Sequence, residues 1–260
     1  MEKNEFVRYA VENRVASITI DRPDKRNALN SVVVSELLKA FQTAEQAEDV
    51  KVVILRANGK AFCAGADLDY LRTLQAYNFE ENLQDSNHLK SLFEWIYKMG
   101  KPVIALIQGH AIAGGAGLAT VCDFAFTVPE AKFGYTEVKI GFIPAIVMTF
   151  LIRKVGETRA KEMLLSGDII NAETAERFNM LNKVVPADEI EQYVKEFAEK
   201  LCKQNSGQSM AITKKMIGDV QTFPITEAFN FAARMNARAR ASEDCKKGIA
   251  AFLNKEKLEW

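Results

Sequence analysis

A glycine-rich stretch at residues 109–118 is the part of the sequence best suited to binding negative charge. It follows the apolar run 103–107, which has the composition of a buried strand, and it leads into 118–122, which can continue as a helix. A strand, a glycine turn and a helix in this order present free backbone N–H groups at a helix N-terminus, where the helix dipole favours an anion. The glycines also allow a ligand to approach the backbone closely. This turn is therefore a candidate binding site for an anionic group.

A second loop of the same kind, residues 58–68, follows the short apolar run 52–55. It contains Ala64-Gly65-Ala66-Asp67, and Asp67 lies where a helix would begin, a favourable position for a carboxylate. One glycine after a strand is usually only a tight turn, and that remains the simpler interpretation of each loop alone. Two such loops allow a sharper hypothesis, in which one backbone N–H from each binds the same oxygen. That arrangement is an oxyanion hole, suited to charge developing on a thioester or ester carbonyl.

Glu137 is the candidate proton carrier. It follows Phe133-Gly134 and precedes the largely apolar segment 138–143, and a carboxylate among apolar neighbours has a raised pKa and can carry a proton near neutral pH. A solvated residue at a strand edge is the plainer interpretation of the local sequence, and the two N–H-donating loops favour the catalytic one. His110, inside the glycine turn, is the other candidate base. A single histidine among small residues is more often packed or hydrogen-bonded than catalytic.

Several other functions are disfavoured by composition and spacing. The chain has no phosphate-binding G-x-x-x-x-G-K-[ST], no G-x-G-x-x-G within a strand–helix–strand unit and no G-x-S-x-G nucleophile motif. Its four cysteines and two histidines show no metal-ligand spacing, so no metal is expected. Lys+Arg and Asp+Glu number 34 each, so nucleic acid is not expected as the main partner. The apolar segments are interrupted or too short to span a bilayer, and the polar N-terminus does not resemble a targeting peptide, so we expect a cytoplasmic protein without membrane contact.

The elements that would position these residues alternate between strands and helices, which indicates an α/β fold. We expect a hairpin over 5–20, a helix capped by Asn30 or Ser31, and a mobile helix or loop over 69–88 that could act as a substrate lid. Further expected elements are helices at 89–99, 145–152, 157–165 and 172–179, a last strand at 181–185, and a helical tail from 188 onward with a joint at Pro224.

Together these residues resemble the crotonase (enoyl-CoA hydratase/isomerase) superfamily over nearly the whole chain. The matching segments are Asp21-Arg22-Pro23, Asn27 to Asn30, Ala61 to Leu68, Pro102 to Ala105, Gly109 to Gly115, Cys122-Asp123, Phe133-Gly134 with Glu137, Ile140 to Pro144, and Ala251 to Leu253. The segments 137–145 and 252–255 look most like those of methylglutaconyl-CoA hydratases of leucine breakdown.

The resemblance implies a spiral core of ββα units, which we place at residues 1–200, and a C-terminal helical segment at 201–260 that serves oligomerisation and closes the CoA pocket. It implies a homotrimer or a dimer of trimers. It also implies an acyl-CoA substrate and no separate cofactor, since coenzyme A is part of the substrate.

The resemblance also assigns roles to individual residues. The backbone N–H groups of Ala66 and Gly114 would bind the thioester oxygen, and Glu137 would move the proton. Residues proposed to contact the substrate are Ala64, Asp67, Leu68, Gly117 and, for the CoA phosphates, Lys25, Arg26 and Lys255. Lys255 would come from the same chain or from a neighbouring subunit.

One position departs from the family pattern. Hydratases of this family commonly carry a second glutamate where this chain has Gly117, which has no side chain. We therefore expect an enoyl-CoA hydratase in which Glu137 does both jobs, or in which a carboxylate of the substrate helps to hold the water. The alternatives are an isomerase that needs a single glutamate, a decarboxylase that needs only the oxyanion hole, and a non-catalytic protein that binds CoA esters, another protein or RNA.

Overall fold

A β-hairpin forms one edge of the larger of two sheets in the computed structural model, which describes residues 4–260. Strands β1 (Val7–Glu12) and β2 (Val15–Ile20) pair antiparallel. Asn13 and Arg14 between them have φ values of 51° and 67°, as the tight turn of a two-residue hairpin requires. The hairpin predicted over 5–20 is thus confirmed.

The chain then repeats a strand–strand–helix unit that sends its two strands to different sheets. The first strands, β3 (Val52–Ala57), β5 (Val103–Ile107) and β7 (Phe124–Thr127), extend the large sheet in parallel, in the order β1-β2-β3-β5-β7-β10. The second strands, β4 (Ala61–Cys63), β6 (His110–Ile112) and β8 (Lys132–Gly134), run parallel in a small sheet ordered β4-β6-β8-β9. This is the predicted spiral of ββα units.

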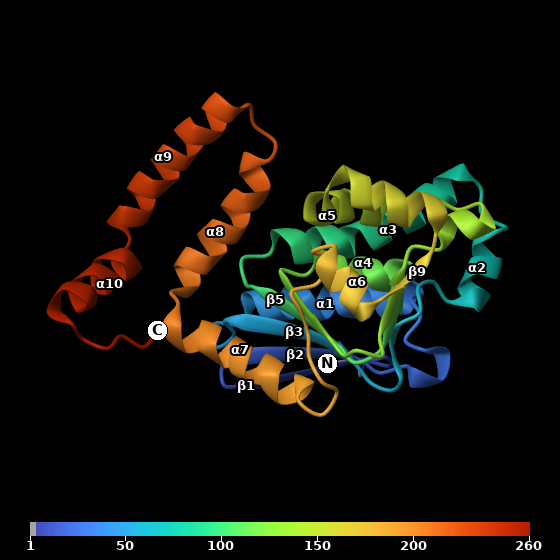
Figure 1. Ribbon diagram of the computed structural model, residues 1–260, viewed down its shortest axis with the longest axis horizontal. Coiled ribbons are helices and arrows are strands. Elements are labelled where there is room, and N and C mark those ends of the chain that lie inside the picture. The colour runs from blue at the N-terminus through green and yellow to red at the C-terminus, as the bar shows by residue number, and fades with distance from the viewer. Residues whose placement is uncertain (1–3) are drawn as a thin grey trace.

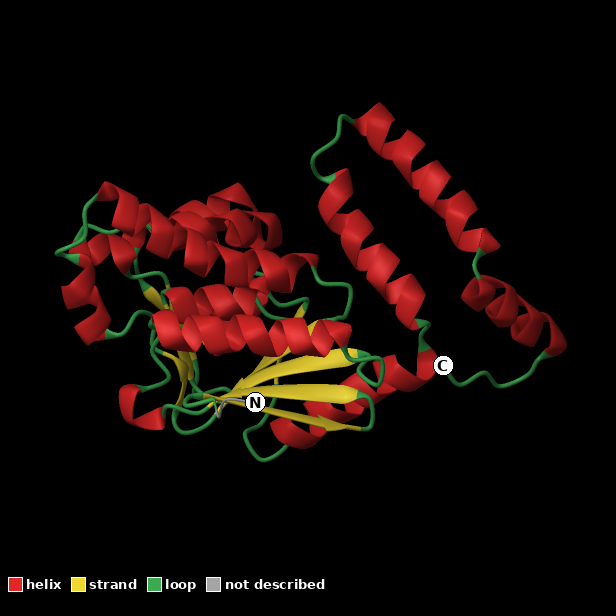
Figure 2. Cartoon of the chain, turned by 180° about the vertical axis from the view of Figure 1, so that it is seen from behind, coloured by secondary structure: helices red, strands yellow, loops and turns green. Residues whose placement is uncertain are grey.

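Helices cover both faces of the large sheet (Figures 1 and 2). α1 (Ser31–Gln46) and α3 (Phe79–Lys98) pack together on one side, and α4 (Gly114–Val121) lies among β4, β5 and β6. α7 (Ile190–Gln204) packs against β2, β3, β5 and β7, and Phe197 on it makes edge-to-face contacts with Phe124 and Phe126 of β7. The apolar strands are consequently buried from both sides, which explains their continuous Val, Ile and Leu runs.

The segment 69–88, predicted to be a mobile helix or loop, is largely helical. It forms α2 (Leu68–Leu74) and the first half of α3, which begins at Phe79 rather than at 89. Most side chains in this stretch are exposed, so no apolar periodicity marks the helix. The helix start was signalled instead by a capping box, in which Asn78 accepts from the Glu81 N–H and the Glu81 carboxylate accepts from the Asn78 N–H.

Other boundaries also differ from the sequence prediction. In the small sheet, a strand end was expected at Phe133-Gly134, where β8 ends, but β4 and β6 were missed because three residues are too few to show a period. The helices expected at 145–152 and 157–165 are confirmed as the two parts of α5 (Ala145–Ser166), which are separated by a kink at Gly156, where φ is 74°. The remaining elements are the short η1 (Pro23–Lys25), η2 (Glu137–Ile140), β9 (Ile169–Asn171), α6 (Ala172–Arg177) and β10 (Lys183–Val184).

Three helices form an arm that projects from the rest of the chain, in orange and red in Figure 1. They are α8 (Gly207–Val220), α9 (Ile225–Ala241) and α10 (Glu243–Asn254), and Pro224 is the N-cap of α9, as the predicted joint requires. α7 continues past residue 200 to Gln204 on the sheet, so we use "core" for residues 4–204 and "arm" for 207–254. No helix within residues 4–260 is both long and apolar enough to cross a membrane.

Candidate active site

Three adjacent strands of the small sheet bring the predicted catalytic residues together. β4, β6 and β8 are neighbours and run in the same direction, so their carboxyl ends meet at one edge of the sheet. Ala66 follows the end of β4, Gly114 the end of β6 and Glu137 the end of β8. Residues separated by up to 71 positions in the sequence, from 66 to 137, therefore converge because of the strand order.

Backbone pairing leaves the Ala66 N–H free. The loop 64–67 pairs with the segment 26–29: the Ala64 N–H donates to the Arg26 carbonyl at 3.1 Å, the Leu29 N–H to the Gly65 carbonyl at 2.7 Å, and the Asp67 N–H to the Leu29 carbonyl at 2.8 Å. In this parallel bridge Leu29 pairs with the Gly65 carbonyl on one side of Ala66 and with the Asp67 N–H on the other, and within residues 4–260 the Ala66 N–H has no acceptor. It is available to a ligand.

Gly114 supplies a second free N–H. It is the first residue of α4, where the N–H groups have no partner within the helix. Ala113 before it has φ 50° and ψ −122°, a conformation that residues with a Cβ rarely adopt, and its N–H donates to the Gly134 carbonyl at 2.7 Å. That hydrogen bond ties the start of α4 to the strand that leads to Glu137.

The two N–H-donating loops are in direct contact. Gly65 has φ 87°, and a Cβ placed on it would lie 3.0 Å from the Ala113 Cβ and 3.8 Å from the Gly114 nitrogen. A Cβ on Gly115 would lie only 2.1 Å from the Cys63 carbonyl oxygen. Glycine is required at both positions, because any side chain would push the two loops apart.

Glu137 presents a carboxylate with an unsatisfied oxygen. It is the first residue of η2, and its Oε2 is buried and has no hydrogen-bond partner among the described residues. Burial raises the pKa of Glu137 above the usual range, and a hydrogen bond from its own backbone N–H offsets this only in part. The group is thus suited to exchanging a proton near neutral pH, as its apolar sequence context predicted.

Gly117 leaves no room for a second carboxylate. It is buried on α4, and a Cβ placed on it would lie 2.2 Å from Val147 Cγ1 and 3.1 Å from Phe93 Cε1. Val147, in the first turns of α5, is itself buried. An apolar side chain from the next helix therefore occupies the space that a side chain at 117 would use.

Comparison with known proteins identifies the family. The sequence matches the family described as Enoyl-CoA hydratase/isomerase over residues 10–260. The chain belongs to the enoyl-CoA hydratase/isomerase family. It is 38% identical over 244 residues, 94% of this chain and 96% of the other, to a Thermus thermophilus protein with a provisional enoyl-CoA hydratase name, and 34% identical to the crotonyl-CoA hydratase of Syntrophomonas wolfei, covering 96% and 95%. The crystal structure of an enoyl-CoA hydratase from Shewanella pealeana is 30% identical and superimposes with a TM-score of 0.95, covering 100% of this chain and 97% of that one.

The other residues predicted to contact the substrate differ in exposure and in their partners. Ala64 is half-buried, and Leu68 is 74% exposed at the start of α2. Lys25 forms an exposed ion pair with Asp69 at 3.0 Å, which partly occupies its ammonium group, whereas Arg26 is exposed in the left-handed conformation that ends η1. These positions leave Arg26 the freer of the two cations for a phosphate group.

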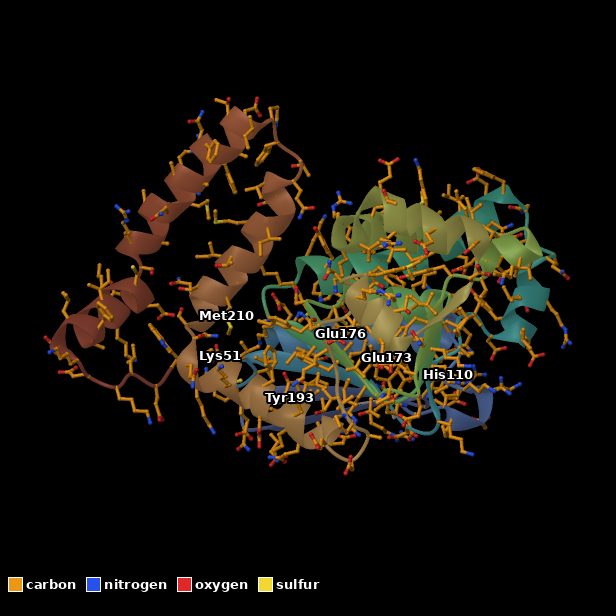
Figure 3. All side chains as sticks on the ribbon, viewed as in Figure 1. Lys51, His110, Glu173, Glu176, Tyr193 and Met210 are labelled. Atoms are coloured by element: carbon orange, nitrogen blue, oxygen red, sulfur yellow. The ribbon has the colours of Figure 1, made fainter. Side chains whose placement is uncertain are left out.

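Two predicted residues are not brought into the site. His110 is exposed at the start of β6, and Figure 3 shows it on the core, on the side away from the arm. Lys255 is the C-cap of α10, and α10 and α2 lie at opposite ends of the molecule (Figure 1). Within one chain, Lys255 is therefore remote from Glu137, and it could reach a site only on another copy.

The Asp67 side chain is not free to bind substrate, because it is paired with Arg22, a residue that the site prediction missed. The Asp67 carboxylate is 4% exposed and lies 2.5 Å from Arg22 Nη1, and its other oxygen accepts from the N–H groups of Asp69 and Tyr70. Arg22 appeared only as part of the Asp21-Arg22-Pro23 motif. Arg22 could have been identified from Asp67. A carboxylate that caps a helix in an apolar loop needs a counter-charge when it is buried.

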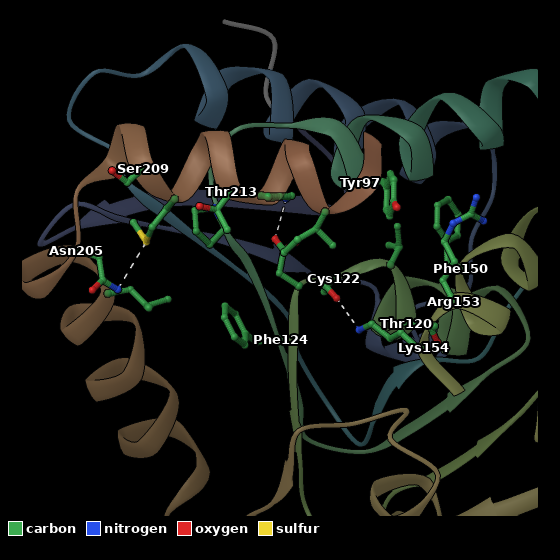
Figure 4. Close-up of a pocket in the computed structure, with 18 of the residues that line it drawn as sticks. Tyr97, Thr120, Cys122, Phe124, Phe150, Arg153, Lys154, Asn205, Ser209 and Thr213 are labelled. Carbon is green, nitrogen blue, oxygen red and sulfur yellow. Dashed lines mark hydrogen bonds and ion pairs between the residues drawn. The ribbon is translucent and has the colours of Figure 1, made fainter. Parts of the chain in front are cut away.

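A separate cavity of about 770 Å³ lies where α8 leaves the core (Figure 4). Its lining includes Tyr97, Phe150 and Met210, and two lysines with partners of their own. Lys154 donates to the Cys122 carbonyl at 2.7 Å, burial lowers the pKa of Lys154, and Lys214 lies 2.7 Å from the Asp123 carboxylate. None of the predicted site residues lines this cavity.

Metal ligation has no evident location. Within residues 4–260, no three His, Cys, Asp or Glu side chains are grouped as metal ligands. The donors that converge at the candidate site are instead two backbone N–H groups and one carboxylate, a set suited to a polarised carbonyl and a mobile proton.

Proposed function

We propose that this protein is an enoyl-CoA hydratase that adds water across the 2,3 double bond of an acyl-CoA thioester. The observation that carries the proposal is that two backbone N–H groups with no acceptor in residues 4–260, at Ala66 and Gly114, lie at the same sheet edge as Glu137, whose carboxylate oxygen Oε2 is buried. The enoyl-CoA hydratase names of relatives that align over nearly the whole chain support it.

The two N–H groups would bind the thioester oxygen. When water adds to C3, electrons move onto that oxygen and form an enolate. Two fixed donors stabilise this charge without reorganising during the reaction. Coenzyme A would provide binding energy remote from the reacting carbons and so position the acyl group.

Glu137 would carry out both proton-transfer steps in this scheme. As a carboxylate it removes a proton from water while the water oxygen bonds to C3. As a carboxylic acid it then returns that proton to C2 as the enolate collapses. One H and one OH are added in total, and the carboxylate is regenerated, so a single group with a raised pKa suffices.

For the acyl group we propose 3-methylglutaconyl-CoA. The sequence at 137–145 looks like that of methylglutaconyl-CoA hydratases, and Val147 and Phe93 exclude a protein carboxylate at 117. The free carboxylate of this substrate could hold the water in its place.

An enoyl-CoA isomerase is the second candidate, and the filled space beside Gly117 is the observation that favours it. An isomerase needs one base to remove a proton at one carbon and return it two carbons away. Glu137 and the same two N–H groups would serve that reaction through a dienolate.

The assembly and the CoA contacts are also part of the proposal. We place the 3′-phosphate and pyrophosphate of CoA near Arg26 and Lys25 of one chain, with Lys255 supplied by a neighbouring chain of a homotrimer or a dimer of trimers. The protein would act in the cytoplasm, with no cofactor besides the CoA of its substrate.

The test is a turnover assay in H2-18O with crotonyl-CoA, 3-methylglutaconyl-CoA and a 3-enoyl-CoA, read by mass spectrometry. Label in a 3-hydroxyacyl product supports a hydratase, and the preferred acyl group identifies the substrate. A shifted double bond without label contradicts hydration and favours the isomerase. No turnover of any of the three would favour a decarboxylase or a non-catalytic CoA-ester binder.

A further inference from the structure

A buried ion pair lies directly beside the Ala66 N–H. Asp67 follows Ala66, and its carboxylate contacts the guanidinium of Arg22 at 2.5 Å. The two side chains are only 12% and 4% exposed, so this pair differs from most other ion pairs of the chain, which lie at the surface. An ion pair removed from water needs good geometry and further hydrogen bonds to persist.

Arg22 is held in place by several neighbours. Its Nη1 also donates to the Ala28 carbonyl at 3.2 Å, and its guanidinium lies 4.9 Å from the centre of the Phe6 ring. Its backbone N–H donates to Asn27 Oδ1, and the Asn27 amide in turn donates to the carbonyls of Asn58 and Ala61. Arg22 is therefore a fixed charge rather than a mobile surface side chain.

The pair links the two segments that define the oxyanion loop. Arg22 contacts Ala28 on the 26–29 segment and Asp67 on the 64–67 loop, and these two segments are the partners of the parallel bridge that leaves the Ala66 N–H free. Asp67 also fixes the start of α2, since it accepts from the N–H groups of Asp69 and Tyr70. The Asp67 carboxylate thus fixes the position of the 64–67 loop through Arg22 and the start of α2 through the helix cap.

We propose that Arg22 and Asp67 are positioning residues, which hold the Ala66 N–H at the place where it meets the thioester oxygen. The inference rests on the proposed function. It adds that the strength of the oxyanion hole depends on an ion pair that does not touch the substrate.

Burial alone would raise the pKa of Asp67, but Arg22 and the two α2 N–H groups outweigh it, so the pKa lies below the usual range. The carboxylate is therefore charged in the wild-type protein. An Arg22→Met substitution keeps most of the volume but leaves that charge buried without its partner. The loop can then relieve the cost by turning Asp67 toward water, which displaces the Ala66 N–H.

The first experiment compares the wild-type protein with Arg22→Met and the double variant Arg22→Met/Asp67→Asn by steady-state kinetics on the substrate found above. We expect kcat to fall about 10- to 100-fold in Arg22→Met, with KM within about threefold, because a misplaced donor mainly weakens the transition state. The double variant should recover several-fold, since it has no uncompensated charge. Loss of activity that scales with the fraction of unfolded protein would overturn the inference.

The second experiment does not need turnover. Butyryl-CoA labelled with 13C at the thioester carbonyl is bound to each protein, and its carbonyl stretch is read by infrared difference spectroscopy. We expect a lower frequency on the wild-type protein than in free butyryl-CoA, and a value at least halfway back to the free one in Arg22→Met. No shift on the wild-type protein contradicts the proposed function together with this inference. A shift that is the same in Arg22→Met overturns this inference alone.

Arg8→Met is the matched control. Arg8 forms an ion pair with Asp21 at 3.1 Å, but the two side chains are 50% and 27% exposed, and within residues 4–260 neither forms a hydrogen bond or an ion pair with the 64–67 loop. We expect kcat, KM and the carbonyl frequency of this variant to stay within experimental error of the wild type, since exposed pairs contribute little. An equal effect of Arg8→Met would mean that the loss in Arg22→Met is not specific to the oxyanion loop.

Discussion

The core and the arm bury their apolar side chains to very different extents. In the core, Phe41, Phe62 and Phe93 are fully buried, and strand residues from both sheets pack into one continuous cluster. In the arm, α8 and α9 have no buried residue, and α10 has only Ala251. Apolar side chains such as Ile225, Phe229 and Phe252 are 69–82% exposed there.

The difference shows which part of the chain satisfies its own hydrophobic requirements. The core closes its sheets with α1, α3, α4 and α7, whereas the arm leaves apolar faces on three successive helices without cover. Exposed apolar surface of this extent is typical of an interface. It is consistent with the proposed trimer, in which the arm would mediate association and the core would carry the chemistry. The following predictions can break or sharpen that division.

The largest effect should come from the core. Glu137→Gln removes the proton carrier but keeps the shape of the side chain, so turnover should fall about 10²- to 10⁴-fold while acyl-CoA affinity changes little. Lys255→Gln on the arm is the comparison, with a change confined to affinity. Turnover is followed by mass spectrometry and affinity by calorimetry. Equal losses of turnover in the two variants would contradict the division.

Two phenylalanines offer a direct test of the difference in burial. Phe41→Ala should lower the free energy of unfolding by about 3–5 kcal/mol, because it leaves a cavity in the core. Phe229→Ala should cost less than about 0.5 kcal/mol in dilute protein, because its ring is 69% exposed. Denaturant unfolding at several protein concentrations measures both. If the arm packs on a second copy, the cost at Phe229 grows with concentration.

The contact between α4 and α5 should show non-additive changes. Gly117→Ala adds a methyl group 2.2 Å from Val147 Cγ1, and we expect it to lower stability by about 1–3 kcal/mol. Val147→Ala in the same chain removes that clash, so the double variant should be more stable than the sum of the single changes implies. Thermal unfolding of the four proteins gives the coupling, and strict additivity would show that the two side chains do not compete for one space.

The smallest effect is a pH dependence of stability. Because burial raises the pKa of Glu137 in the folded state above its unfolded value near 4.5, charging this residue costs stability as the pH rises through that interval. Glu137→Gln removes the cost. The variant should therefore unfold at a slightly higher temperature than the wild type at pH 8, and the difference should shrink as the pH falls below about 4.5. A constant difference across this range would show that the carboxylate is not desolvated.

Much of the fold could be predicted from local signals. The hairpin, the buried strands at 52–55 and 103–107, the capped helix after Asn30 and the joint at Pro224 each have a signature within a few residues. The three-residue strands of the small sheet and the exposed first half of α3 have none, because a period needs more residues or a buried face. The segment 69–88, for which the sequence left helix and loop open, forms α2 and the first half of α3, and Tyr70 on α2 is hydrogen-bonded to Asp85 on α3.

The sequence by itself determined the chemistry of the site: two glycine loops with free N–H groups and one carboxylate in an apolar context. Only the tertiary structure decided which atoms are available. The order β4-β6-β8 brings the loops and Glu137 together, Val147 closes the space beside Gly117, and Arg22 removes the Asp67 carboxylate from contact with substrate. These relations join residues 23 to 71 positions apart, so they follow from strand order and packing and cannot be read from local patterns of residues.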